Sequence, residues 1–279
     1  ISTQYTMTTL EELGLLKMDF LGLRTETVIE DTLKNVRDTE GLEIAIDAIP
    51  MDDAGVYRMI GQGQTSGVFQ LESAGMTSFM KELKPESLED VIAGISLYRP
   101  GPMSFIPKYI EGKKDPSKIV YRTPLLEPIL NKTYGCIVYQ EQVMQIVRDL
   151  AGYTMGRSDL VRRAMAKKHA DELAREQENF IHGNAELGVP GCVAHGIPED
   201  VAAAIYDEMT DFAKYAFNKS HAAAYAVVAY ETAWLKYHYP VEYMAAIMTS
   251  VIDATPKLVA YIQTLKEMGI ELLPPDVNK

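Results

Sequence analysis

YQEQVMQIVRDL, the stretch of residues 139–150, carries apolar side chains at intervals of three and four. This spacing places Val143, Ile146, Val147 and Leu150 on one face of an α-helix and leaves the opposite face polar. The same periodicity continues from Glu141 to the end of the chain, with breaks at 152–156, at 188–198 and at Pro240. The sequence therefore predicts a mainly α fold.

The front of the chain differs. Residues 14–24 read GLLKMDFLGLR, and in a β-strand successive side chains fall on opposite faces. Leu16, Met18 and Phe20 would then face a core, while Lys17 and Asp19 share the other face. This pattern predicts a short β segment before the helices, so the fold becomes α+β if that segment is counted. The face with Lys17 and Asp19 is either an ordinary solvated edge or a place for a metal and an anion.

Composition narrows the function. The chain has 279 residues and a formal net charge of −12, which disfavours a protein that coats nucleic acid generally. Its first residue is Ile1, which we interpret as an internal position of a longer protein. No stretch approaches the roughly 20 apolar residues of a membrane span, so no membrane partner is expected. Cys136 and Cys192 lack the spacing of metal ligands and are interpreted as buried, small apolar side chains.

Basic residues concentrate in one predicted helix. Residues 158–168 read SDLVRRAMAKK, with Ser158 as the expected N-cap. At 100° per residue, an apolar arc of Leu160, Val161, Ala164 and Met165 lies opposite Arg162, Arg163 and Lys167. Two interpretations stay open at this point: a solvated basic face balanced by acidic residues further along, or a stripe that meets a polyanion.

A second candidate site precedes an alanine-rich helix expected from about Ala222 to Tyr239. Asn218 or Ser220 can cap that helix, which leaves Lys219 and His221 beside unpaired backbone N–H groups, a setting typical of phosphate sites. Tyr215 offers a flat surface for a base or a sugar. Taken singly, these residues also fit a core aromatic and a surface histidine. Gln142 and Gln145 are expected to be solvated.

Several enzyme classes lack support. The sequence contains no P-loop, GxSxG elbow, HExxH pair or GxGxxG turn. His221 has no evident serine or cysteine partner. Hydrolase, P-loop ATPase and dinucleotide-binding folds are therefore disfavoured.

Taken in order, several segments resemble the bacterial DNA polymerase III alpha subunits, the family C replicative polymerases. The matching segments are LKMDFLGLRT (16–25), VFQLES (68–73), YRPGPM (98–103), TYG (133–135), YQEQVMQ (139–145), LVRRAMAKK (160–168), FNKSHAAAYA (217–226) and LPPDVN (273–278). The resemblance covers essentially the whole chain. Ala166 and Ala216 stand where many members of the family have glycine.

The resemblance implies a domain division: residues 1–25 as the end of a palm domain and 26–279 as a fingers domain, with a subdivision near 115–135. It also implies site residues. Asp19 would be one of three metal-binding aspartates, and Lys17, also assigned to catalysis, would lie beside the primer end. The implied nucleotide-binding residues are Arg162, Arg163, Lys167, Tyr215, Lys219 and His221.

The chemistry implied by the resemblance is DNA-directed DNA synthesis during chromosomal replication, by phosphoryl transfer at two Mg²⁺ ions. The implied partners are a primer–template, a dNTP and, for a full-length protein, a sliding clamp, a proofreading exonuclease and a clamp loader, all in the cytoplasm. One carboxylate cannot hold two metals, so we expect this chain alone to be inactive and not to bind Mg²⁺ stably. The alternatives are a non-catalytic helical module that binds DNA or a replisome partner, and an error-prone paralogue.

Overall fold

The computed structural model describes residues 2–18, 22–167, 170–213, 215, 217–274 and 276. Within these residues the fold is helical, as predicted, and pairing between extended segments is limited to two isolated bridges. The α-helices are α1 (Met7–Glu12), α2 (Arg24–Glu40), α3 (Ala54–Gly61), α4 (Ala74–Leu83), α5 (Leu88–Leu97), α6 (Ile106–Lys114), α7 (Glu127–Leu130), α8 (Gln140–Ala151), α9 (Met155–Lys167), α10 (Ala170–His182), α11 (Glu199–Ala213), α12 (Lys219–His238), α13 (Pro240–Ser250) and α14 (Thr255–Glu267).

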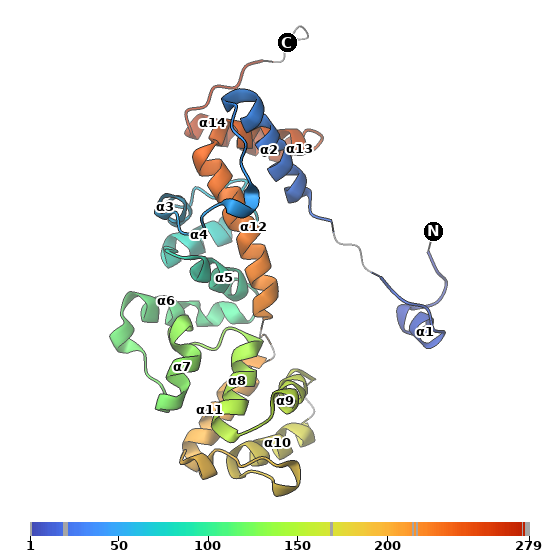
Figure 1. Cartoon of the computed structure of the whole chain (residues 1–279), viewed down its shortest axis with the longest axis vertical. Helices are drawn as coiled ribbons and strands as arrows, with labels where there is room; N and C mark the ends of the chain where they lie inside the picture. Colours follow the sequence, from blue (N-terminus) through green and yellow to red (C-terminus); the bar gives the residue numbers. More distant parts are fainter. Residues whose placement is uncertain are drawn as a thin grey trace.

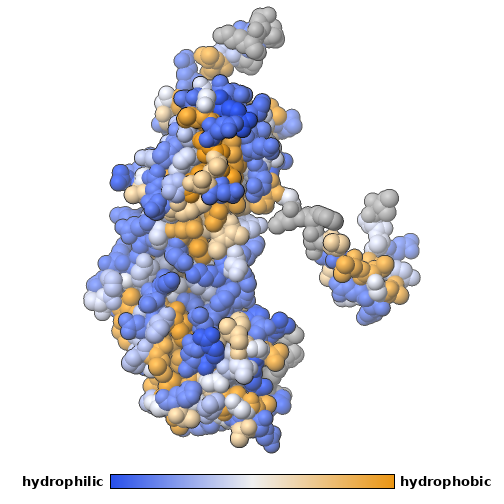
Figure 2. All heavy atoms as spheres, in the orientation of Figure 1, coloured by the Kyte–Doolittle hydropathy of each residue, from blue (hydrophilic) through white to orange (hydrophobic). Residues whose placement is uncertain are grey.

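The helices form an elongated body with α12 as its central rod (Figure 1). One end is an upper core, in which α2 packs against α13. A middle core joins α3, α4 and α5 to the first half of α12. The other end is a distal core built on α8, α9, α10 and α11. On the face drawn in Figure 2, hydrophobic patches lie scattered among a mostly hydrophilic surface.

Small residues allow α12 to lie close to α5. Ala222, Ala226, Ala229 and Ala233 recur along one face of α12 and are buried in the middle core. At the other side of α5, a Cβ on Gly94 would come within 2.6 Å of the terminal carbon of Met80. Close helix approach of this kind excludes larger side chains, because protein interiors are packed without spare volume.

Short polar side chains cap two of the helices. Asp53 Oδ1 accepts a hydrogen bond of 2.7 Å from Gly55 N at the start of α3. Asn218 Oδ1 accepts one of 2.9 Å from His221 N at the start of α12. Of the two expected candidates at this second start, the structure selects Asn218. Cys136 and Cys192 carry free thiols and are buried, as the sequence predicts.

The predicted strand is absent from the part of residues 14–24 that the structure describes. Residues 15–18 and 22–23 take no strand conformation, and Leu16 and Met18 are 84% and 67% exposed rather than facing a core. Asp19 and Phe20 lie outside the described residues. A strand needs a neighbour to satisfy its N–H and C=O groups, and the described chain offers this segment none.

Two local expectations about α9 also change. Ser158 lies inside α9, which begins at Met155, so it is not an N-cap; its hydroxyl donates to Thr154 O at 3.0 Å. Leu160 is 61% exposed, although Val161, Ala164 and Met165 are buried as expected. The sequence analysis did not predict α4.

Among the described residues, no helix has the length and apolarity needed to span a membrane.

The surroundings of Glu231 on α12 disfavour its ionised form. Burial, followed by the nearby carboxylates of Glu26 and Asp47, raises the pKa of Glu231 to about 7 from its ordinary value of 4.5. The folded state therefore resists ionisation of Glu231 more than the unfolded state does. As a result, the free energy of unfolding falls as the pH rises from about 4.5 to about 7, and it is constant above that range.

We predict that Glu231→Gln raises the free energy of unfolding at pH 8 by about 1 kcal/mol, after allowance for solvent screening of this half-buried group. Urea unfolding at several pH values measures this. The exposed Glu30→Gln on α2 is the matched control, with no expected change. An unfolding free energy that declines between pH 4.5 and 7 as steeply in Glu231→Gln as in the original chain would contradict the assignment.

Candidate functional site

Two of the places where the chain crosses between the middle and distal cores pair with each other. Tyr139 and Phe217 form a parallel bridge, and Gln140 N donates a 3.0 Å hydrogen bond to Phe217 O. This pairing places the start of α8 beside the segment that leads into α12. Two segments far apart in sequence thus meet at one junction, and one of them, the segment before α12, is the second candidate site of the sequence analysis.

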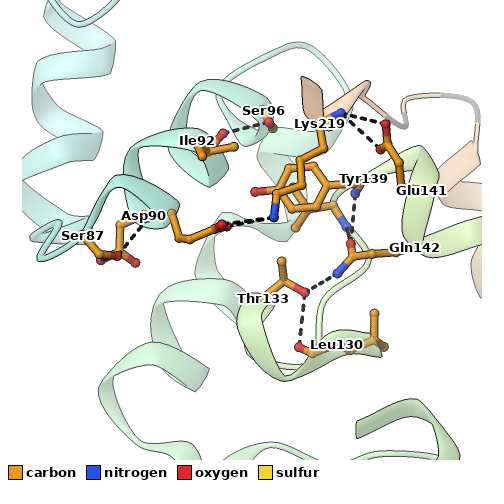
Figure 3. Close-up of polar contacts among 12 residues, drawn as sticks. Ser87, Asp90, Ile92, Ser96, Leu130, Thr133, Tyr139, Glu141, Gln142 and Lys219 are labelled. Carbon is orange, nitrogen blue, oxygen red and sulfur yellow. Dashed lines mark hydrogen bonds and ion pairs between the residues drawn. The ribbon is translucent and has the colours of Figure 1, made fainter. Parts of the chain in front are cut away.

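A buried amide supports this junction (Figure 3). Gln142 Oε1 accepts hydrogen bonds from Val138 N at 2.8 Å and Tyr139 N at 3.0 Å. Its Nε2 donates to Thr133 Oγ1 at 2.8 Å and to Ile129 O at 3.2 Å. The expectation that Gln142 is solvated is wrong, since the residue is 5% exposed. Its side chain instead satisfies backbone groups that would otherwise be buried without a partner.

The two arginines of α9 share one carboxylate. Arg162 donates through Nη2 and Nε to Asp159 Oδ1 at 2.7 and 3.0 Å, and Arg163 Nη2 lies 2.8 Å from Asp159 Oδ2. The Arg162 hydrogen bonds are the main reason that the pKa of Asp159 is lowered, with a further contribution from Arg163. Arg162 Nη1 also donates to Gln140 Oε1 at 3.0 Å. Arg162 therefore reaches the junction, while Arg163 remains largely exposed.

Carboxylates already occupy the start of α12. Lys219 N donates to both oxygens of Glu141 at 3.1 and 3.2 Å, and Lys219 Nζ forms a 3.0 Å ion pair with Glu89. The ammonium also lies 5.2 Å from the centre of the Tyr139 ring. Figure 3 shows Lys219 beside Tyr139 and Glu141. A phosphate that used this helix start would take the place of Glu141.

Arg99 is a functional candidate that the sequence analysis missed. Its guanidinium carbon lies 3.9 Å from the centre of the Phe217 ring, and Nη2 donates to Tyr215 O at 3.0 Å. Nε donates to Ser96 O at 3.2 Å. Burial lowers the pKa of Arg99. The YRPGPM segment contains this position, but the sequence analysis assigned Arg99 no role.

Arg99 lines a cavity of about 500 Å³ next to the junction. The 68–73 segment forms another part of its wall, and α12 contributes His221 and Tyr225. Tyr215 is 45% exposed and lies nearby, against Gly101. Gly101 has a φ of 103°, a conformation suited to glycine, and a Cβ there would overlap the Tyr215 ring.

A buried lysine on α12 holds the loop that leads to this wall. Lys236 is 3% exposed, and Nζ donates to Gln64 O at 2.9 Å and Ser66 O at 2.8 Å. Burial lowers the pKa of Lys236 to about 8. A second bond from the same helix follows along the chain, because Phe69 N donates to Thr232 Oγ1 at 3.1 Å. The cavity wall is thus fixed from α12.

The structure brings Arg162 to Gln140, whose backbone pairs with Phe217 in the segment that also carries Tyr215, Lys219 and His221. Arg163 lies next to Arg162 on the same carboxylate, Asp159. The side chain of Lys167, at the end of α9, lies outside the part of the chain that is described, as does Asp19. Lys17 is described, and it lies in the N-terminal segment, which Figure 1 shows apart from the helical body. Among the described residues, no three His, Cys, Asp or Glu side chains gather in a way that could hold a metal.

Comparisons with a family model and with individual known proteins agree on one family. Residues 25–188 match the family described as the bacterial DNA polymerase III alpha subunit finger domain. The chain is 47% identical to the DNA polymerase III subunit alpha of Thermus aquaticus over 282 residues, which cover 99% of this chain and 22% of that protein. It is 46% identical over 277 residues to the same subunit of Halalkalibacterium halodurans, covering 99% and 24%. The chain thus spans about a quarter of these relatives' length.

We predict that Gln142→Ala lowers the free energy of unfolding by about 2–4 kcal/mol, because the N–H groups of Val138 and Tyr139 lose their acceptor inside the protein. Urea unfolding measures the change. Gln145→Ala, on the same helix and not buried, is the matched control and should change stability by no more than about 0.5 kcal/mol. Equal effects of the two substitutions would show that the network does not support the junction.

We predict that Lys236→Met speeds amide hydrogen exchange in residues 64–69, about tenfold, because the loop loses its donor while the apolar volume is kept. The exposed Lys266→Met on α14 serves as the control. Unchanged exchange in Lys236→Met would contradict this role.

In the unsubstituted chain, the free energy of unfolding should increase as the pH rises from about 8 to 10.5, since the folded state binds the Lys236 proton more weakly than the unfolded state.

Proposed function

The chain belongs to the bacterial DNA polymerase III alpha subunit finger domain family, and we propose that it forms the fingers of a DNA-directed DNA polymerase. In this proposal it binds the triphosphate of an incoming dNTP and the primer–template. One observation carries it: Arg162 contacts Gln140, whose backbone pairs with Phe217 beside Tyr215 and His221. The basic helix α9 and the segment that leads into α12 therefore both contact the junction of Gln140 and Phe217.

The two arginines suit a polyphosphate. Guanidinium groups bind phosphate oxygens through two parallel N–H groups, which lysine cannot do. Arg162 and Arg163 now divide these donors between the oxygens of Asp159. A triphosphate carries more negative charge than one carboxylate, so it can take over donors from Asp159. Lys219 and the N-terminus of α12 would add charge from the other side of the junction.

We propose roles for the N-terminal residues from the resemblance alone. Asp19 would hold one of the two Mg²⁺ ions, and Lys17 would lie beside the primer end. When bound, such ions would supply charge stabilisation for phosphoryl transfer. The described residues contain no cluster for them. The remaining carboxylates, the clamp, the exonuclease and the clamp loader would then belong to other parts of a full-length polymerase.

We predict that this chain binds dTTP–Mg²⁺ and that replacing both Arg162 and Arg163 by alanine weakens binding at least about tenfold, through loss of charge-assisted hydrogen bonds. Titration followed by backbone NMR shifts of Gln140 and Phe217 measures weak affinities and reports their location. Arg58→Ala, an exposed arginine of α3, is the matched control.

Two outcomes would contradict this proposal or the expectations behind it. If dTTP binding is indifferent to both arginines while duplex DNA binds with a steep salt dependence, the chain is a DNA-binding helical module and not the nucleotide-binding part of a polymerase. Primer extension by this chain alone would contradict the expectation that it needs further carboxylates.

A further inference from the structure

A second cavity, of about 510 Å³, opens between α3 and the loop that joins α4 to α5. Its walls are residues of α3 between Ala54 and Gln62 and residues 84–86 of the loop. Figure 1 shows α3 beside α12 in the middle of the body, whereas α9 lies at the distal end. The volume is within the range of small-molecule sites, about 300–1,000 Å³. Of the residues that line it, none belongs to the candidate site at the junction.

The uncharged part of the lining offers a ligand few polar groups. Ala54, Gly61 and Pro85 have no side-chain donor or acceptor. The hydroxyl of Tyr57 is already used, because it donates to Met51 O at 2.6 Å. The fifth uncharged residue of the lining is Gln62, which is exposed. A ligand that fills this cavity is therefore expected to have an apolar body.

The charges of the lining are unbalanced. Arg58 and Lys84 are exposed, and in the part of the chain that the structure describes neither forms an ion pair with a carboxylate. The lining contains one acidic residue, Glu86, whose side chain is 84% exposed and lies 4.0 Å from the Lys113 ammonium. Two cations thus stand against one carboxylate, in a chain whose net charge is −12. This excess favours an anion.

Lys84 has a backbone conformation that its side chain disfavours. It ends α4 with a φ of 48° and a ψ of 69°, in the left-handed region, where glycine is the usual residue at the end of a helix. A lysine at this position costs stability that a glycine would not cost. Strain of this kind is typical of positions where a side chain is needed for function.

A buried ion pair fixes the loop that carries Lys84. Lys113 Nζ, from α6, donates to Lys84 O at 2.9 Å and pairs with Asp90 Oδ2, from α5, at 2.8 Å. The same carboxylate oxygen accepts from Glu86 N at 2.9 Å. The side chains of the pair are only 11% and 5% exposed. The backbone of the loop is therefore held in place without a ligand, which lowers the cost of ordering the site on binding.

We propose that this cavity binds a small organic anion, with a carboxylate or phosphate group between Arg58 and Lys84 and an apolar body against the uncharged lining. Sites for small ligands combine apolar walls with a few charged groups that fix orientation. A guanidinium can bind two oxygens of such a group at once, and an ammonium adds a compact charge. The proposal does not depend on the proposed function, since neither Arg162 nor Arg163 lines this cavity.

The test is titration of this chain with phenyl phosphate and with phenylacetate, followed by the backbone NMR shifts of Gly61 and Glu86. Inorganic phosphate lacks the apolar body and benzyl alcohol lacks the charge, so each should bind at least about fivefold more weakly than the tighter of the two aromatic anions. Arg58→Gln should weaken that anion at least about fivefold. The preference between phenyl phosphate and phenylacetate identifies the head group, and either preference agrees with the proposal.

Lys84→Gly separates binding from folding. The substitution removes the ammonium and the backbone strain together, so it should weaken the aromatic anion at least about threefold while raising the melting temperature by about 2 °C. Weaker binding in this variant would then not result from loss of the fold. Arg37→Gln on α2 and Lys266→Gln on α14 are the matched controls, and they should bind like the unsubstituted chain.

Three results would overturn the proposal. The first is an absence of shifts at Gly61 and Glu86 with either aromatic anion up to about 10 mM. The second is equal affinity for phenyl phosphate, phenylacetate and inorganic phosphate, which would show that no apolar body is recognised. The third is anion binding that Arg58→Gln and Lys84→Gly leave unchanged.

Discussion

The hydrogen bond from Gln140 N to Phe217 O is the interaction on which the rest of the site depends. It fixes the register of the two chain crossings between the middle and distal cores. On one side, Gln140 receives Arg162 from α9. On the other, Phe217 carries Arg99 on its face. A shift of one residue would turn these side chains to opposite faces, so one backbone contact places Arg162 and Arg99 relative to each other.

The helix α12 gives that junction a rigid support. Its alanines let it lie against α5 in the middle core, and Leu235 near its other end is buried in the upper core. Tyr230 donates from its hydroxyl to Pro50 O at 2.9 Å, and Lys236 holds the 64–66 loop. The helix therefore connects the first turn, where His221 lies, to two separate cores. Groups mounted on such an element keep their positions more precisely than groups on loops.

Local signals predicted the local structure. Periodicity gave α8 and α12 within a few residues, and the capping role of Asn218 follows from a short polar side chain before a helix. The sequence could not predict Arg99, because its contacts with Tyr215 and Phe217 join segments far apart along the chain. The partners of Gln142 are close in sequence, but a helical pattern does not tell that a polar side chain turns inward to the backbone of the preceding loop. The expected burial of Leu160 was wrong for a related reason: periodicity assigns a residue to a face, and only packing decides how wide the buried part of that face is. The domain division at residue 25 and the roles of Lys17 and Asp19 stay predictions.

Glu141 belongs to α8 but caps α12, so one carboxylate clasps the distal part of the molecule to the central rod. Any anion that took over the Lys219 amide would have to undo this clasp. Anion binding at that helix start and loss of the Glu141 contact are then thermodynamically linked, and each must favour the other by the same free energy. A neutral or cationic ligand would leave the contact in place. The charge of the ligand, rather than its shape, would decide whether this contact breaks.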